Sequence, residues 1–306
     1  MEEAKQKART ESGTPALRTN GLCRRFPGFL GLRSRSALRS IDLEVPRGTS
    51  LGLIGPNGSG KSTLLRLAAG VDRPTAGRVE VFGIDVSRRR SSAARARLAY
   101  LPDDSPFPVE LSALAVLDLL GALSGLARQE RRRRAARMLE RVGLTSAARR
   151  TLGTYSRGML RRLGLAQAFL TDPDLVLLDE PTAGLDASGY VALAELTAEA
   201  RARGASIVVA SHVLSDLHEA CDRLAVLIDG KQVASGTLAE VMAPAAAETS
   251  PVPGLRVEGL DGPGRSALAL WVQEHGGTTR PLEADTGGRV ALGDLYRRLA
   301  PPESGP

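Results

Sequence analysis

Short runs of apolar residues alternate with helical patterns along most of this chain, beginning near Ala16. The clearest strand candidates are residues 50–54, 98–101, 175–178 and 206–210, which are rich in Val, Leu, Ile or Ala. The segment 61–70 reads as the helix that follows the first of these strands. Such alternation is typical of an α/β fold around a largely parallel sheet.

Between residues 112 and 143 the pattern changes to two helices rich in Ala, Leu and Arg. Ala135, Met138, Leu139 and Val142 fall on one helical face, and the arginines at 131–134 largely flank or oppose it. We interpret this region as a helical insert in the α/β core, within a helical subdomain of about residues 104–170.

The two ends of the chain differ from this core. Residues 1–15 are polar and are predicted to be disordered. The segment 243–254 is rich in Ala and Pro and is typical of a linker. Residues 255–306 are expected to form a small strand–helix appendage. The sequence contains no internal repeat, so we expect one α/β domain over residues 16–242.

Composition narrows the class of protein. The 306 residues include 41 Lys and Arg against 34 Asp and Glu, a net charge of +7, with arginine clusters near 88–97 and 128–150. A solvated surface and attraction to anionic headgroups both account for these clusters. With aromatics at 3 %, a base-stacking surface is poor, and no nucleic-acid partner is expected. No apolar run approaches the length of a membrane span, so any membrane role requires a partner.

A glycine-rich loop carries the first chemical signal. Gly55, Gly60, Lys61 and Ser62 satisfy the phosphate-loop pattern between a strand and a helix. Backbone N–H groups of such a loop cradle phosphates, while Lys61 pairs with the β- and γ-phosphates and Ser62 ligates Mg²⁺. The predicted nucleotide-binding residues here are Gly55, Pro56, Asn57, Gly58, Ser59, Gly60, Lys61, Ser62 and Thr63.

Two acids end the apolar strand 175–178. Asp179 is predicted to hold the metal, and Glu180 to act as general base or to position the attacking water. His212 follows the strand candidate 206–210, at the sheet edge where α/β folds gather ligand groups. We therefore predict a catalytic role for Glu180 and His212.

The segment Tyr155-Ser156-Arg157-Gly158-Met159 lies before a helix, upstream of the acidic strand. Together with the phosphate loop, Asp179-Glu180-Pro181, Gly184-Leu185-Asp186 and His212, in that order, it strongly resembles the ATP-binding-cassette (ABC) ATPases. The resemblance covers roughly residues 16–242. It implies an α/β, P-loop NTPase core of the ABC type with an antiparallel β edge and a helical subdomain, followed here by a small C-terminal α/β appendage.

The resemblance further implies a head-to-tail homodimer that sandwiches two ATP molecules. Ser156 and Gly158 would touch the γ-phosphate held by the other subunit, and Asp186 would lie at the dimer seam. His212 would contact the γ-phosphate. Phe26 is similar in position to the aromatic residue that stacks on adenine, although Phe29 is close by.

Two departures from the family pattern carry information. Arg157 and Met159 replace the glycine and glutamine of the usual Leu-Ser-Gly-Gly-Gln signature. Asp103 stands closest to the usual metal-contacting glutamine, so it is a candidate Mg²⁺ ligand. These features, with a C-terminal extension, resemble the ATPase subunits that serve separate permeases, including drug, haem and sodium exporters and the copper-linked ATPase of nitrous-oxide reductase maturation.

The sequence therefore predicts an ATPase that uses ATP and Mg²⁺, closes as a dimer and drives an integral-membrane permease from the cytoplasmic face of the inner membrane. The alternative is a soluble ABC-type ATPase with a mechanochemical or regulatory role. Mechanochemical members carry two cassettes, long coiled coils or zinc modules, which this sequence lacks. A cassette that binds ATP only as a regulatory switch is disfavoured by the intact Lys61, Asp179, Glu180 and His212, whereas Arg157 leaves it open.

Overall fold

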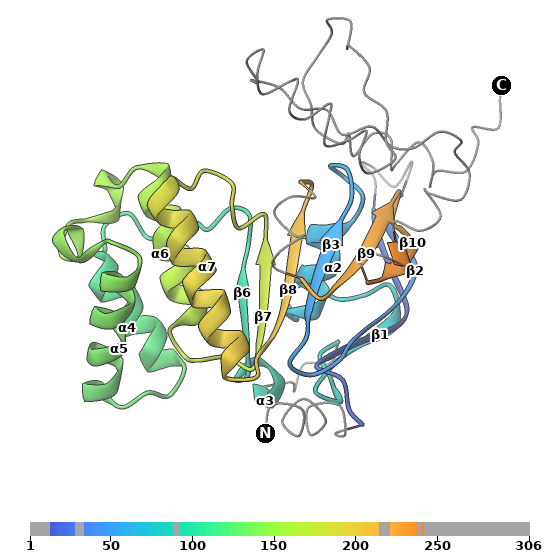
Figure 1. Ribbon diagram of the computed structural model, residues 1–306, viewed down its shortest axis with the longest axis horizontal. Helices are drawn as coiled ribbons and strands as arrows, with labels where there is room; N and C mark the ends of the chain where they lie inside the picture. The colour runs from blue at the N-terminus through green and yellow to red at the C-terminus, as the bar shows by residue number, and fades with distance from the viewer. Residues whose placement is uncertain (1–12, 28–33, 88–91, 214–220, 238–239, 242–306) are drawn as a thin grey trace, which may run out of the picture. The chain divides into compact units, whose positions relative to one another are not determined.

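Two β-sheets organise the residues that the computed structural model describes, which are 13–27, 34–87, 92–213, 221–237 and 240–241 (Figure 1). A four-stranded antiparallel sheet contains, in spatial order, β2 (Arg35–Val45), β1 (Leu17–Phe26), β4 (Ala76–Val81) and β5 (Ile84–Asp85). A six-stranded sheet contains, in spatial order, β10 (Lys231–Gly236), β9 (Arg223–Ile228), β3 (Ser50–Ile54), β8 (Ser206–Ser211), β7 (Leu175–Asp179) and β6 (Leu98–Leu101).

The central strands of the six-stranded sheet run parallel. β3 pairs with β8 and β9, and β7 pairs with β8 and β6, while β10 is antiparallel to β9 at one edge. Every residue of β3, β7 and β8 is buried. Burial on both faces explains why these strands read as continuous apolar runs in the sequence. The α/β fold with antiparallel strands at its edge confirms the prediction.

Helices connect these strands. α2 (Lys61–Ala68) follows β3, α3 (Ser92–Arg95) precedes β6, and α7 (Ala187–Ala202) leads from β7 to β8. The predicted helix 61–70 ends two residues early, because Gly70 adopts a φ of 67° and terminates it. The four predicted strands are confirmed to within one residue.

The helical insert is also confirmed. It contains α4 (Ala113–Leu123) and α5 (Arg128–Arg141), then 3₁₀ turns at Thr145–Ala147 and Leu152–Thr154, and α6 (Arg157–Phe169). The predicted apolar face is buried, with Ala135, Met138, Leu139 and Val142 each at most 6 % exposed. In Figure 1 these helices lie beyond β6, the edge strand of the large sheet. The bounds 104–170 stay a prediction.

One apolar cluster joins the two sheets. Leu22 and Ile41 of the antiparallel sheet, Leu64 and Leu65 of α2, and Val208 of β8 are all fully buried within it. Among the described helices, none is long and apolar enough to cross a bilayer. The predicted disordered start, apart from residues 13–15, the linker 243–254 and the appendage 255–306 lie outside the described residues.

Candidate functional site

The carboxyl ends of β3, β7 and β8 meet at one edge of the sheet. In the parallel register Ile54 lies opposite Ser211, and Asp179 lies opposite Ala210. The segments that leave these strands carry the phosphate loop, Glu180 and His212. Parallel pairing therefore brings together groups that are up to about 150 residues apart in sequence.

The phosphate loop is held in a conformation that only glycine adopts easily. Gly58 and Gly60 have φ values of 81° and 109°. A Cβ on Gly60 would lie 2.6 Å from the Ala37 carbonyl oxygen of β2, so a side chain there would collide with that strand. No acidic residue occupies the first turn of α2, which leaves the positive end of the helix directed at the loop. This arrangement suits an anion.

Lys61 lies inside this loop and is 6 % exposed. Its Nζ donates to the carbonyl oxygens of Gly55 at 2.7 Å and Pro56 at 3.3 Å, and lies 3.8 Å from Oε1 of Glu180. Burial lowers the pKa of Lys61, and the charges of Glu180 and Asp179 oppose that change. The ammonium is thus a fixed positive charge between the loop and the acidic strand.

Ser62 and Asp179 form a pair of oxygen ligands. The Ser62 hydroxyl donates to Oδ1 of Asp179 at 3.0 Å. Asp179 is 1 % exposed. Burial raises the pKa of Asp179 to about 6, to which the charges of Asp103 and Glu180 add, against the Ser62 hydrogen bond and Lys61. Oxygen donors of this kind suit Mg²⁺. Within the described residues no group of three or more His, Cys, Asp or Glu forms a ready-made metal cluster.

Glu180 is held in a strained backbone conformation. Its φ is 46°, in the left-handed region that disfavours residues with a Cβ, and its N–H donates to Ala210 O at 2.9 Å. The carboxylate is 13 % exposed, and its Oε2 lies 2.9 Å from Nδ1 of His212. The structure therefore brings Lys61, Glu180 and His212 into one contiguous group.

Phe26 and Asp103 are not part of this contiguous group. Phe26 ends β1 opposite Arg35, and the Arg24 guanidinium lies 4.5 Å from the ring centroid. A Cβ on Gly58 would lie 3.2 Å from Nη2 of Arg35, so this strand pair approaches the phosphate loop. Asp103 is exposed, and its charge contributes to the raised pKa of Asp179. Phe29 lies outside the described residues.

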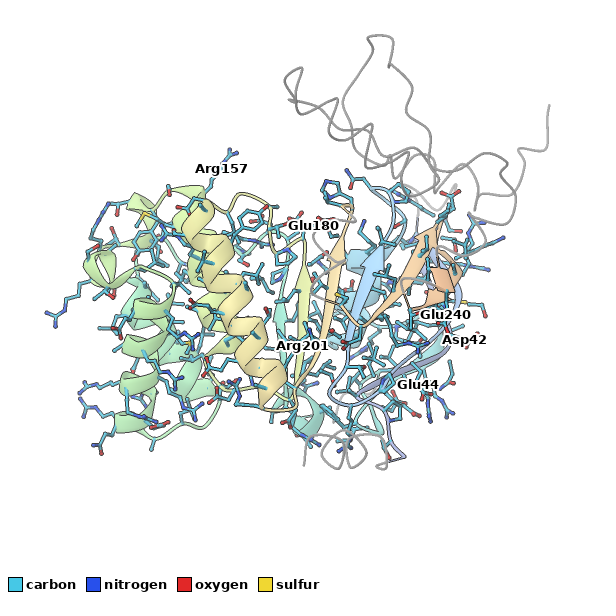
Figure 2. All side chains as sticks on the ribbon, viewed as in Figure 1. Asp42, Glu44, Arg157, Glu180, Arg201 and Glu240 are labelled. Atoms are coloured by element: carbon cyan, nitrogen blue, oxygen red, sulfur yellow. The ribbon has the colours of Figure 1, made fainter. Side chains whose placement is uncertain are left out.

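Ser156, Gly158 and Asp186 lie apart from the phosphate loop. Ser156 caps α6 by accepting a hydrogen bond from Met159 N at 3.2 Å, and Asp186 caps α7 by accepting from Gly189 N at 2.9 Å. Both cap residues are exposed. Figure 2 shows Arg157 at the outer end of α6, directed away from the ribbon. Among the described residues, no hydrogen bond joins these three to the phosphate loop.

Sequence reasoning missed Arg161. Its guanidinium is buried behind the acidic strand and donates to the carbonyl oxygens of Asp179 and Glu180. In the sequence, only its position five residues after Ser156 could have indicated this role. The neighbouring arginine, Arg162, occupies almost the same position but contacts other groups. Composition and spacing do not distinguish the two.

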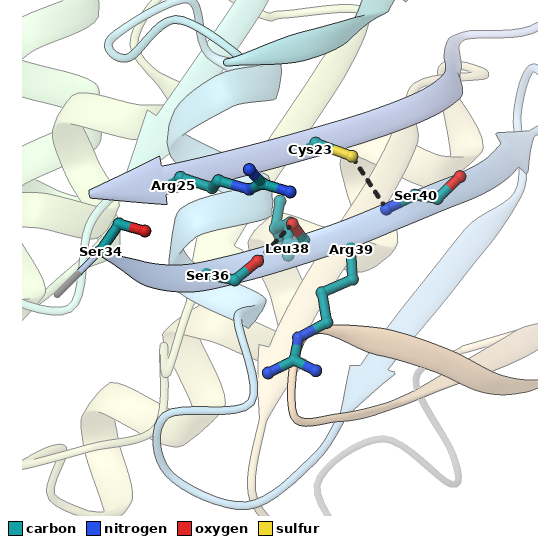
Figure 3. A pocket seen from close by; sticks show the side chains of 7 residues that line it. All are labelled: Cys23, Arg25, Ser34, Ser36, Leu38, Arg39 and Ser40. Carbon is teal, nitrogen blue, oxygen red and sulfur yellow. Dashed lines mark hydrogen bonds between the residues drawn. The ribbon is translucent and has the colours of Figure 1, made fainter. Parts of the chain in front are cut away.

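A separate cavity of about 470 Å³ opens between β1 and β2 (Figure 3). Its lining includes Arg25, Arg39 and three serines, and the Cys23 sulfur there accepts a hydrogen bond from Ser40 N at 3.2 Å. The lining contains neither Phe26 nor any phosphate-loop residue. The cavity is therefore distinct from the group at the strand ends.

A model of the ABC transporter family matches residues 38–183. The daunorubicin/doxorubicin resistance ATP-binding protein DrrA of Streptomyces peucetius is 34 % identical over 228 residues, which cover 74 % of this chain and 67 % of that protein. This chain belongs to the ABC transporter ATP-binding proteins. The cassette is also 38 % identical over 209 residues to the daunorubicin resistance ATP-binding protein DrrA3 of Streptomyces coeruleorubidus, covering 68 % of this chain and 66 % of that protein.

A further relative of the cassette is an uncharacterized ABC transporter ATP-binding protein of Synechocystis, 39 % identical over 217 residues, or 70 % of this chain. The match spans 60 % of that protein's length and 66 % of DrrA3. A solved ATP-binding subunit of an ABC transporter is 29 % identical with a TM-score of 0.68, covering 76 % of this chain and 93 % of that one. A dimeric cassette bound to ADP and Pi has a TM-score of 0.67 at 24 % identity, covers 72 % of this chain and 98 % of that one, and shows the fold alone.

Proposed function

We propose that this cassette binds Mg²⁺-ATP, hydrolyses it to ADP and phosphate, and drives a separate integral-membrane permease of the exporter type. The observation that carries the proposal is the meeting of Lys61, Asp179 and Glu180 at the carboxyl ends of β3 and β7. A buried ammonium inside a glycine loop, beside two carboxylates, fits a nucleotide triphosphate and its metal.

Magnesium belongs to this proposal. Ser62 and Asp179 would hold the ion, because their oxygens already lie 3.0 Å apart, and Asp103 is a further candidate ligand. Mg²⁺ usually keeps waters and substrate phosphates among its ligands, so two protein oxygens suffice. The bound ion would neutralise charge on the phosphates.

Hydrolysis would use Glu180 on the attacking water. As the water oxygen bonds to the γ-phosphorus and the bond to ADP breaks, the Glu180 carboxylate accepts the water proton. His212 holds Oε2 of that carboxylate at 2.9 Å and lies at the edge where the γ-phosphate would sit. Lys61 offsets charge on the phosphates from the other side of Glu180.

The segment 155–159, which corresponds to the family's signature sequence, supports a head-to-tail homodimer. Ser156 and Gly158 begin α6, where the helix dipole and free N–H groups favour an anion, yet the phosphate loop of the same chain lies elsewhere. A second copy would bring its bound γ-phosphate to this helix, with Asp186 at the seam. Phe26, which Arg24 already contacts, would stack on adenine.

Exposed apolar residues of the helical region support a membrane partner. Val109, Leu119 and Leu123 are 55 %, 48 % and 77 % exposed. A permease that contacts this region would cover them. The two drug-resistance relatives suggest an exporter, and the cassette would then act at the cytoplasmic face of the membrane.

A detergent pull-down tests this proposal. Tagged Glu180→Gln protein, captured from its own cells with Mg²⁺-ATP, should retain ATP and bring down a multi-spanning membrane protein in stoichiometric amount. Tagged Lys61→Ala protein is the matched control, since it should not close on ATP. Recovery of ribosomes, nucleic acid or soluble protein alone would contradict the transporter role and favour the soluble alternative.

A further inference from the structure

The Arg161 guanidinium connects three segments of the cassette. It projects from α6 and is 6 % exposed. Nη1 donates to the carbonyl oxygens of Pro102 at 2.7 Å and Asp103 at 2.9 Å. Nη2 donates to the carbonyl oxygens of Asp179 at 2.7 Å and Glu180 at 2.5 Å. One side chain therefore holds the segment after β6 and the end of β7.

This contact is poorly suited to stability alone. Burial lowers the pKa of Arg161, and the nearby charges of Asp103, Asp179 and Glu180 oppose that change. Its four hydrogen-bond acceptors are nevertheless neutral carbonyls, and none is a carboxylate. The Nε–H is buried and has no hydrogen-bond partner among the described residues. A buried charge without direct pairing usually contributes less to stability than a well-packed apolar residue. The arrangement instead fixes the positions of four backbone groups.

The position of Glu180 depends on these contacts. Its φ of 46° is unfavourable for a residue with a Cβ and persists only where neighbours hold it. Ala210 O accepts the N–H of Glu180, and Arg161 binds the carbonyl on the other side of the residue. Together they clamp the backbone that directs the carboxylate.

The Arg161 side chain lies about 1.4 helical turns beyond the Ser156 cap, a rise of about 7.5 Å along α6. α6 is a continuous helix from Arg157 to Phe169, so a displacement at its start moves Arg161 as well. The helix thus forms a rigid path from Ser156 and Gly158 to the Glu180 carbonyl.

We propose that Arg161 is a positioning residue that couples contacts made at the start of α6 to the orientation of Glu180. Hydrolysis then depends on Arg161, whereas ATP binding at the phosphate loop does not. The inference rests on the proposed function, because it concerns the hydrolysis assigned to Glu180.

The test compares Arg161→Gln and Arg161→Lys with the parent cassette. Arg161→Gln should lower kcat on the order of 10²-fold, since misplacing a catalytic group by about 1 Å costs this much. Arg161→Lys keeps the charge and some hydrogen-bond donors, so its kcat should lie between that of the parent and that of Arg161→Gln. Affinity for ATP, measured with the Glu180→Gln background to prevent turnover, should change by less than about threefold.

Arg134→Gln is the matched control. Arg134 is a partly buried arginine that donates to the Leu170 carbonyl at the end of α6 and pairs with Glu130 and Asp172, far from the catalytic group. Its loss should lower the melting temperature and leave kcat unchanged below the transition. The positioning role is overturned if Arg161→Gln weakens ATP binding as well as hydrolysis. It is also overturned if the fall in kcat is no larger than the fall in the fraction of folded protein.

A double-mutant cycle with Ser156→Ala tests the coupling directly. If the path through α6 is real, the combined fall in kcat should be at least about threefold smaller than the product of the single effects. Independent, multiplicative effects would overturn it. A parent cassette that binds ATP without hydrolysing it would instead refute the proposed function itself. The Lys61 and Glu180 variants distinguish that outcome from a failure of the positioning role alone.

Discussion

His212 and Glu180 form a close pair in which Nδ1 of the imidazole lies 2.9 Å from Oε2 of the carboxylate. Oε1 of the same carboxylate lies 3.8 Å from Lys61 Nζ. Glu180 is thus held on both sides.

His212→Ala should reduce hydrolysis about 10²-fold while ATP remains bound, as phosphate-release and equilibrium-binding assays would show. His212→Gln retains a donor and should be less impaired. Parent-level turnover in His212→Ala would remove the histidine from the mechanism.

Lys61→Ala should lose at least about tenfold in ATP affinity, because a charge-assisted contact with the phosphates disappears. Isothermal titration with Mg²⁺-ATP measures the loss. Lys231→Ala is the control, since Lys231 is an exposed lysine on β10 and should bind ATP as the parent does. Equal affinity in the two variants would refute the phosphate-loop assignment.

Phe26→Ala should weaken ATP binding about tenfold, the worth of one base stacked on an aromatic ring. Tripolyphosphate, which lacks the base, provides the internal comparison and should bind equally to both proteins. The Arg24 guanidinium already lies 4.5 Å from the ring centroid, so adenine would add to an existing stack. An unchanged ATP affinity would transfer the adenine role to Phe29.

Asp179 gives the cassette a distinctive pH dependence. Burial raises its pKa from 3.8 to about 6, so the folded state binds a proton more tightly than the unfolded state. Protonated Asp179 therefore contributes most to the stability of the folded cassette below about pH 4, and about 3 kcal/mol of that stability is lost as the pH rises through 6. Asp179→Asn removes the titration, so denaturant unfolding at pH 8 should show a more stable protein than the parent. Equal stability of the two at pH 8 would contradict the burial of an ionised carboxylate.

The sequence predicted those features that rest on local pattern. The apolar run at 175–178 reflects burial in a parallel sheet. The glycines reflect close packing of the phosphate loop: a Cβ on Gly60 would collide with the Ala37 carbonyl of β2, and a Cβ on Gly55 with the Leu227 carbonyl of β9. The roles proposed for Ser156 and Asp186 come from the family resemblance, because no spacing rule indicates them, and they stay predictions.

The contacts of Arg161 and the conformation of Glu180 were beyond prediction from pattern. Arg161 and Arg162 are adjacent and chemically identical, yet the first binds the Asp179 and Glu180 carbonyls and the second binds the Val142 carbonyl. Which of them turns inward depends on how α6 packs on the sheet. The φ of Glu180 likewise depends on tertiary contacts, because glutamate has no intrinsic preference for the left-handed region.

The close packing of the phosphate loop on β2 has a mechanical consequence. Arg39 N donates to Gly230 O at 2.7 Å, and Gly230 N donates to Ser59 O at 3.0 Å, so β2, the β9–β10 turn and the loop are tied in series. Gly60 also packs so closely on β2 that there is no space for a Cβ between the loop and that strand. The phosphate loop, β2 and the β9–β10 turn are therefore expected to keep their relative positions when a nucleotide binds or leaves.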